Sequence, residues 1–245
     1  MRIDRLLCEL NIGSRSQVKE LLKKGLIAVD GVTVKKADTQ LDENQVVITF
    51  QGKEYRYCPY VYYMLNKPAG VVSATKDTDT TVMDVFKKSY LKQHDGDLSG
   101  IPIKDMFPVG RLDKDTVGLL LLTNDGDLSH RLLSPKKHVP KKYLVHVNDI
   151  ISPDSAKKLQ AGVFIGEDEM TAPAQIEVFE EDRMKCHLTI TEGKFHQVKR
   201  MFQAVGLQVT YLKRMSMGRL YLDSELKEGE IRELTKDEVL ELMKG

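Results

Sequence analysis

The sequence contains few cysteines, and none of them belongs to a paired motif. Cys8, Cys58 and Cys186 lie far apart in the 245 residues, with no Cys-x-x-Cys spacing. This excludes a disulfide framework and a zinc site, and it is typical of a reducing cytoplasm. Long hydrophobic runs are also absent: no stretch approaches the roughly 18 uncharged apolar residues of a membrane span. Charges interrupt the apolar N-terminus, unlike a signal peptide. We therefore expect a cytoplasmic protein that has no membrane partner.

The whole chain has almost no net charge, but some of its segments have a clear excess of positive charge. The 37 basic and 36 acidic residues leave a net charge of only +1. Residues 1–36 nevertheless carry eight basic and four acidic side chains, and residues 128–148 and 193–222 carry five and six Lys/Arg with no acid. One such block can be a solvated face. Together they favour a polyanionic partner, because clustered cations release condensed counterions when they bind nucleic acid.

A small module is predicted at the N-terminus. Apolar residues at helical spacing predict a first short helix, namely Ile3, Leu6, Leu7 and Leu10. Gly13 is expected to end this helix in the left-handed conformation, and Ser14 with Gln17 forms a capping box that begins a second helix. Asp30-Gly31 joins two β-branched runs as a hairpin turn. Two helices and a small sheet make only a marginal core, so we expect an accessory domain.

The stretch RIDRLLCELNIGSRSQVKELLKKGLIAVDGVTV resembles the S4-like RNA-binding domain. We place this domain at residues 1–55. In that family the second helix and the turn after it face RNA. The resemblance therefore implies four RNA-binding residues in this chain: Arg15, Ser16, Lys19 and Lys23. It indicates binding of structured RNA without naming a reaction.

The run PVGRLDKDTVGLLLLTNDG combines a charged loop with an apolar strand at 117–122. The loop contains four charged side chains: Arg111, Asp113, Lys114 and Asp115. A carboxylate held there by a rigid strand could act as nucleophile or base if a cation keeps it ionised. A turn with surface ion pairs is the alternative. The chain lacks a Ser/His/Asp order, a Walker-type loop, His-Glu-x-x-His and G-x-G-x-x-G, which disfavours hydrolases, P-loop enzymes, zinc proteases and dehydrogenases.

The run GRLDKDTVGLLLLTNDG resembles the catalytic motif of the pseudouridine synthases, in the branch named RsuA. YYMLNKPAGVVSATKD before it, KKYLVHV at 141–147 and EGKFHQVKRMFQAVG at 192–206 also match, in the order and spacing of the family. The resemblance implies an α+β protein in which the S4-like domain is followed by a catalytic domain at 60–245. That domain is expected to have a mixed, mostly antiparallel sheet flanked by helices and loops.

The resemblance also implies the roles of individual residues. Asp113 takes the place of the essential aspartate, which attacks the uridine at C1′ or at C6 or assists elimination through a glycal. Tyr143 takes the place of the tyrosine that stacks on the target base and is the proposed acceptor of the C5 proton. Lys199 matches the ion-pair partner of the aspartate, where many members have arginine. Three further residues are implied as RNA-binding: Arg111 at a phosphate, Lys142 and Arg200. His196 and Gln197 fit either RNA contacts or a helix surface.

The expected substrate is a uridine of small-subunit (16S) ribosomal RNA, the one numbered 516 in the usual scheme, in free RNA or an assembly intermediate. The base must leave its stack to reach the enzyme. The isomerisation has no redox or net hydrolytic step, so we expect no cofactor and no metal, and we expect a monomer. An enzyme for large-subunit (23S) RNA is one alternative. A non-catalytic RNA-binding assembly factor is the other, and the presence of Asp113, Tyr143 and Lys199 argues against it.

Overall fold

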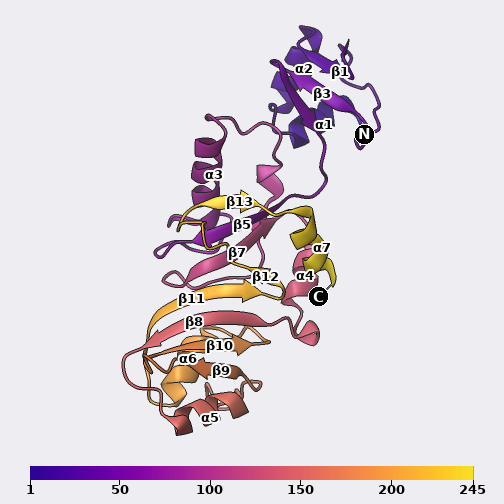
Figure 1. Cartoon of the computed structure of the whole chain (residues 1–245). Helices are drawn as coiled ribbons and strands as arrows, with labels where there is room; N and C mark the ends of the chain where they lie inside the picture. The colour runs from indigo at the N-terminus through magenta and orange to yellow at the C-terminus, as the bar shows by residue number, and fades with distance from the viewer. Residues whose placement is uncertain (245) are drawn as a thin grey trace. The chain divides into compact units, whose positions relative to one another are not determined.

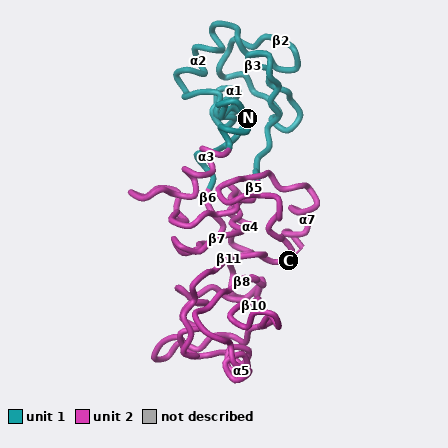
Figure 2. Tube along the Cα trace, turned by 60° about the vertical axis from the view of Figure 1, so that its left-hand side comes forward, with its two compact units in different colours: residues 1–61, 90–106 teal, residues 62–89, 107–245 magenta. Residues whose placement is uncertain are grey.

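A computed structural model describes residues 1–244 of the chain, which divide into two compact units (Figure 2). The first unit comprises residues 1–61 together with 90–106. The second comprises residues 62–89 and the described residues from 107 onward. The chain therefore leaves the first unit, enters the second and returns to the first before completing the second. Within residues 1–244 there is no helix with the length and apolar character needed to span a membrane.

The first unit packs two helices on a four-stranded antiparallel sheet in the order β2-β1-β3-β4. Its elements are α1 (Ile3–Glu9), α2 (Arg15–Lys23), β1 (Ile27–Val29), β2 (Val32–Thr33), β3 (Val47–Phe50), β4 (Lys53–Arg56) and a 3-10 turn, Ile103–Asp105. The predicted capping box is confirmed: the Gln17 backbone N–H donates to the Ser14 hydroxyl, and the Gln17 side chain accepts from the Ser14 N–H. The predicted hairpin turn is also confirmed, with φ of 49° at Asp30 and 78° at Gly31, as a type I′ turn requires.

The expected ending of the first helix at Gly13 was wrong. The left-handed residue is Asn11, with φ of 52°, whereas Gly13 has no positive φ. Asparagine is the usual substitute for glycine in this conformation because its short polar side chain tolerates it. The Asn11 side chain also donates a hydrogen bond of 3.0 Å to the Leu98 carbonyl oxygen, which links the helix end to the returning segment of the same unit.

The second unit is built on a nine-stranded sheet, whose main order is β13-β5-β7-β11-β8-β10-β9 (Figure 1). Its strands are β5 (Tyr62–Lys67), β6 (Phe107–Pro108), β7 (Val117–Thr123), β8 (Lys141–Val147), β9 (Gln175–Val178), β10 (Lys185–Ile190), β11 (Val209–Met217), β12 (Leu220–Tyr221) and β13 (Ile231–Glu233). Only β7 and β11 pair in parallel among the strand pairs of residues 1–244. The expected mixed, mostly antiparallel sheet is confirmed.

Helices and a large apolar core hold this sheet. The helices are α3 (Val82–Gln93), whose last turn belongs to the first unit, α4 (Gly126–Leu133), α5 (Pro153–Ala161), α6 (Gln197–Ala204) and α7 (Lys236–Lys244), with a 3-10 turn, Pro135–Lys137. Leu128 and Leu132 of α4 and Leu242 of α7 join a core cluster with residues of β5, β7 and β11. Every residue of β7 is buried. The loops at the ends of β7 are therefore attached to a completely buried strand.

The parallel pairing of β7 with β11 depends on Gly118. This residue has φ of 100°, and a β-carbon added to it would overlap the backbone oxygen and nitrogen of Arg214 on β11. We expect Gly118→Ala to lower the free energy of unfolding by about 2 kcal/mol or more, because a strained φ and overpacking each cost about 1–3 kcal/mol. Urea unfolding measures this. Gly126→Ala is the control, since nothing lies within 4 Å of a β-carbon there; equal losses from both variants would contradict the account.

Candidate active site

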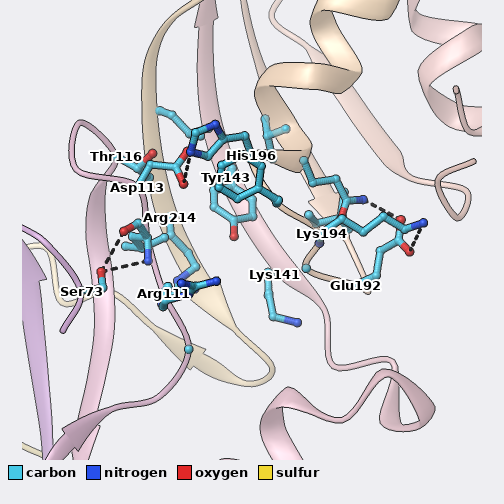
Figure 3. Close-up of a pocket in the computed structure, with 18 of the residues that line it drawn as sticks. Ser73, Arg111, Asp113, Thr116, Lys141, Tyr143, Glu192, Lys194, His196 and Arg214 are labelled. Atoms are coloured by element: carbon cyan, nitrogen blue, oxygen red, sulfur yellow. Dashed lines mark hydrogen bonds and ion pairs between the residues drawn. The ribbon is translucent and has the colours of Figure 1, made fainter. Parts of the chain in front are cut away.

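The loop before β7 carries Asp113 and is fixed by a hydroxyl group. The Ser73 hydroxyl donates to the Leu112 carbonyl oxygen at 2.8 Å and accepts from the Leu112 N–H at 3.0 Å. Leu112 itself is buried, with 6% of its surface exposed. The Leu112 backbone is therefore held through both its N–H and its carbonyl group, and the Leu112 side chain is packed in the interior. This fixes the position from which the Asp113 side chain extends (Figure 3).

A buried lysine holds the rest of this loop. Lys67, at the end of β5, is completely buried, and its ammonium group contacts four carbonyl oxygens at 2.9–3.2 Å. They belong to Pro68, Asp113, Lys114 and Thr116. Burial lowers the pKa of Lys67 to about 8, against the opposing influence of the nearby carboxylates. One side chain thus gathers three carbonyl groups of the Asp113 loop and fixes its curvature.

The Asp113 carboxylate faces the first turn of α6. Its Oδ2 lies 3.3 Å from the Lys199 Nζ. Its Oδ1 lies 3.5 Å from the His196 Nε2 (Figure 3). The structure therefore brings the predicted pair Asp113 and Lys199 together. It also places His196 beside the same carboxylate, at the residue that precedes α6, where its φ of 48° turns the chain.

Lys199 is shared between two carboxylates of one loop. Its Nζ donates to the Asp115 Oδ1 at 2.6 Å, closer than its contact with Asp113. Burial acts to lower the pKa of Lys199, but the hydrogen bond to Asp115 and the charges of both carboxylates outweigh burial and raise the pKa. Burial acts to raise the pKa of Asp115, and the hydrogen bond from Lys199 outweighs it, so that pKa is lowered. The site therefore holds a permanent cation beside Asp113.

Asp113 opens into a cavity of about 610 Å³ that also contains Tyr143 (Figure 3). Tyr143 is 7% exposed and lies on β8, where alternate side chains are buried. Lys141 on the same strand and Arg214 on β11 also line the cavity. The volume falls within the range of pockets that take small molecules. The cavity thus combines a carboxylate, a phenol ring and buried cations.

The predicted RNA-binding residues of the second unit lie in different settings. Arg111 is exposed and lines the cavity. Lys142 lies 3.4 Å from a carboxylate oxygen of Glu177, and Arg200 pairs with Glu169 at 2.9 Å. The four predicted residues of the first unit are all exposed along α2: Arg15, Ser16, Lys19 and Lys23. Gln197, left undecided from the sequence, is buried and donates to the Glu192 carboxylate at 2.6 Å.

Sequence reasoning missed three cations, Lys67, Lys141 and Arg214. Each is more than nine-tenths buried, which is rare for Lys and Arg. Lys67 lies in the family motif YYMLNKPAGVVSATKD and Lys141 in KKYLVHV, whereas Arg214 lies in the acid-free basic block at 193–222. Of the three, only Lys141 could have been found from the sequence, because the period-2 pattern of β8 places it on the same face of the strand as Tyr143. Among residues 1–244 there is no group of three or more His, Cys, Asp and Glu that could hold a metal ion.

Comparison with known proteins finds two family models that match different parts of the chain. Residues 61–204 match the family described as RNA pseudouridylate synthase, and residues 1–47 match the S4 domain. The chain is 46% identical to an uncharacterised RNA pseudouridine synthase, YtzG, of Bacillus subtilis, over 98% of this chain and 97% of that protein. It is 41% identical to ribosomal small subunit pseudouridine synthase A of Vibrio cholerae, over the whole of both chains. A crystal structure of a pseudouridylate synthase, 35% identical, superposes with a TM-score of 0.66 and covers 99% of each chain.

Proposed function

The chain belongs to the RNA pseudouridylate synthase family, and from this premise we propose that it isomerises one uridine of small-subunit ribosomal RNA to pseudouridine. The observation that carries the reaction is the Asp113 carboxylate, which lies 3.3 Å from the Lys199 ammonium group and opens into the cavity that holds Tyr143. The small-subunit target, uridine 516 in the usual scheme, is supported by the full-length similarity to the Vibrio cholerae enzyme.

In the proposed reaction Asp113 acts as an ionised carboxylate. The Lys199 ammonium group lies 3.3 Å from this carboxylate, and a side chain that is only 26% exposed loses part of the water that would weaken a nucleophile. The carboxylate attacks C1′ or C6 of the uridine, or removes a proton as a glycal forms. The N1–C1′ bond breaks, the uracil turns, and C5 forms the new bond to C1′. The bond between Asp113 and C1′ or C6 breaks again, or the proton removed for the glycal returns to the sugar. The C5 proton leaves and N1 gains one, so the atoms balance.

Tyr143 is proposed to stack on the target base and to accept the C5 proton. Its ring is part of the cavity wall and is almost completely buried before RNA arrives. Uridine in folded RNA cannot reach this ring while it is stacked, so the nucleotide must be flipped out, at a cost of a few kcal/mol. Contacts with phosphate, in which Arg111 at the exposed edge of the cavity takes part, offset this cost.

The target is tested by mapping pseudouridine after incubation with small-subunit and large-subunit RNA, free and as subparticles. Carbodiimide-stop sequencing reports each modified position. We expect one modified uridine, in the small-subunit RNA, and none with Asp113→Asn. A modified site in the large-subunit RNA would contradict the proposed substrate, and modification by Asp113→Asn at the wild-type level would contradict the proposed nucleophile.

The exposed lysines of α2 are expected to anchor the RNA. Lys19→Gln combined with Lys23→Gln should weaken RNA binding and reduce the slope of log affinity against log salt by about 1.5, since each phosphate contact contributes about 0.7–0.9. The measurement is a salt titration of RNA affinity with the full chain, because residues 90–106 complete the first unit. Lys87→Gln combined with Lys88→Gln, two exposed residues of α3, is the control. An unchanged slope in the α2 variant would show that α2 does not bind RNA.

A further inference from the structure

The floor of the cavity is formed by Lys141 and Tyr143 of β8 and Arg214 of β11, two neighbouring strands. Tyr143 of β8 is the direct partner of Arg214 on β11, and Lys141 lies two residues before Tyr143. Directly paired residues project to one face of a sheet, as do residues two apart. Side chains paired across strands lie about 5 Å apart at their β-carbons. A base stacked on the Tyr143 ring is therefore flanked by the side chains of Arg214 and Lys141.

These two cations are only partly satisfied by the protein. The Lys141 Nζ donates to the Val139 carbonyl oxygen at 3.1 Å, and the Arg214 Nε donates to the Leu119 carbonyl oxygen at 2.7 Å. The Arg214 Nη2 is buried without a hydrogen-bond partner. Neither cation forms an ion pair with a carboxylate in the described part of the chain. The Glu192 carboxylate acts on the charge of Lys141 only from beyond ion-pair distance. A buried cation that is not paired with a carboxylate is costly, so the floor is suited to a ligand that brings acceptor atoms and negative charge.

The chemistry of the reaction supplies such a ligand. If Asp113 attacks C1′ or a glycal forms, the electron pair of the N1–C1′ bond stays on the uracil, and the charge spreads to O2 and O4. If Asp113 adds to C6, the electron pair of the C5–C6 double bond moves through C4 to O4. In every variant negative charge develops on the carbonyl oxygens of the base. Fixed cations stabilise charge that develops in a buried site more strongly than water does.

We propose that Lys141 and Arg214 contact the carbonyl oxygens of the flipped uracil and stabilise the negative charge that develops there. This inference rests on the proposed function. It gives the cations of the site separate tasks: Lys199 is engaged by Asp113 and Asp115 and serves the nucleophile, whereas Lys141 and Arg214 serve the base. It also makes the floor a set of hydrogen-bond donors, which fits the two carbonyl oxygens of uracil.

Lys141→Met tests the proposal without endangering the fold. Methionine has a similar volume, and burial lowers the pKa of Lys141 to about 8, so loss of the cation should leave the thermal midpoint unchanged or raise it. Single-turnover conversion should fall about 100-fold, the loss typical for one donor at a developing anion. Lys141→Arg keeps the charge and should lose less than tenfold. Lys185→Met is the matched control, because Lys185 lies on β10 of the same sheet and pairs with Asp182 at 2.8 Å.

A substrate with a better leaving group separates charge stabilisation from positioning. Fluorine at C5 withdraws electrons, so 5-fluorouridine at the target position needs less help from a cation. The readout is the single-turnover loss of the target nucleoside in whichever ribosomal RNA the wild-type protein modifies. The deficit of Lys141→Met relative to wild type should shrink at least about tenfold with 5-fluorouridine. Arg214→Gln should behave in the same way if its thermal midpoint is retained.

The outcomes distinguish this inference from the proposed function. Equal deficits of Lys141→Met on uridine and 5-fluorouridine would mean that the lysine only shapes the cavity, and would overturn the inference. Wild-type activity in Lys141→Met would overturn it as well, while leaving the proposed function intact. Absence of pseudouridine from every RNA treated with the wild-type protein would contradict the proposed function, and the inference with it.

Discussion

Asp113→Asn is expected to lower the rate of pseudouridine formation by at least about 10³-fold, because the amide keeps the shape of the carboxylate but is neither charged nor nucleophilic. RNA affinity should stay the same or rise, since a negative charge is removed from a surface that meets phosphate. Single-turnover kinetics with saturating enzyme separates the two quantities. The loss should appear in the rate constant and not in the dissociation constant.

Asp115→Asn is the matched control for this variant. It makes the same substitution two residues along the same loop, and it removes the shorter of the two contacts of Lys199. The Asp115 side chain is 73% exposed, and it carries no role in the proposed reaction. Its loss should cost less than about tenfold, because an exposed ion pair contributes at most about 1 kcal/mol. Equal losses from Asp113→Asn and Asp115→Asn would contradict the assignment of the nucleophile.

Lys67→Met is expected to lower the rate about 100-fold, since misplacement of a reacting group by about 1 Å has an effect of that size. The variant removes the donor for four carbonyl groups. Asp113 and Lys114 keep other backbone donors, from Thr116 and Gly70, so the carbonyl groups of Pro68 and Thr116 lose the partner that Lys67 supplied. We expect the free energy of unfolding to fall by about 1–3 kcal/mol. Rate and urea unfolding are measured on the same preparation.

Lys114→Met is the control for Lys67→Met. Lys114 belongs to the same loop, but its ammonium group pairs with Asp79 at the surface, where both side chains are 53% exposed. Its stability effect should stay within about 0.5 kcal/mol. If Lys67→Met kept the wild-type rate, the lysine would have no part in positioning Asp113.

The pH dependence of stability gives an independent check on Lys67. Its pKa is about 8 in the folded protein, whereas an unfolded chain has the ordinary value of 10.5. Between these values the unfolded state binds more protons, so this group makes stability rise with pH through the window from about 8 to 10.5. Lys141 contributes in the same direction. Urea unfolding at several pH values should therefore show a smaller rise for Lys67→Met than for the wild type.

Local features of the fold could be predicted because their causes lie within a few residues. The Ser14 capping box and the Asp30-Gly31 hairpin each depend on a pattern of four residues or fewer. The apolar run of β7 indicates a strand buried on both faces. The same local reasoning failed at Gly13, since an asparagine two residues earlier met the need for a left-handed residue.

The site could be predicted only in part, because its contacts join distant segments. Asp113 and Lys199 are far apart in sequence, and no periodic pattern predicts that they meet. Only the resemblance to the family motifs predicted this pair. Lys67 contacts the Asp113 loop from 46 residues away. A lysine at the end of a strand looks like a surface residue, and only tertiary packing shows that it is buried. Residues 90–106 likewise join the first unit through contacts such as Lys53 with Asp97, at 2.7 Å.

The most direct test of the central claim, that this protein isomerises a small-subunit uridine with Asp113, is tritium release from ribosomal RNA labelled at C5 of its uridines. Formation of the C5–C1′ bond expels the C5 hydrogen, so each isomerisation frees one label to water. With excess wild-type protein we predict release that levels off at one label for each small-subunit RNA molecule, and no release by Asp113→Asn. Release by Asp113→Asn at the wild-type rate, or none by the wild type, would contradict the claim.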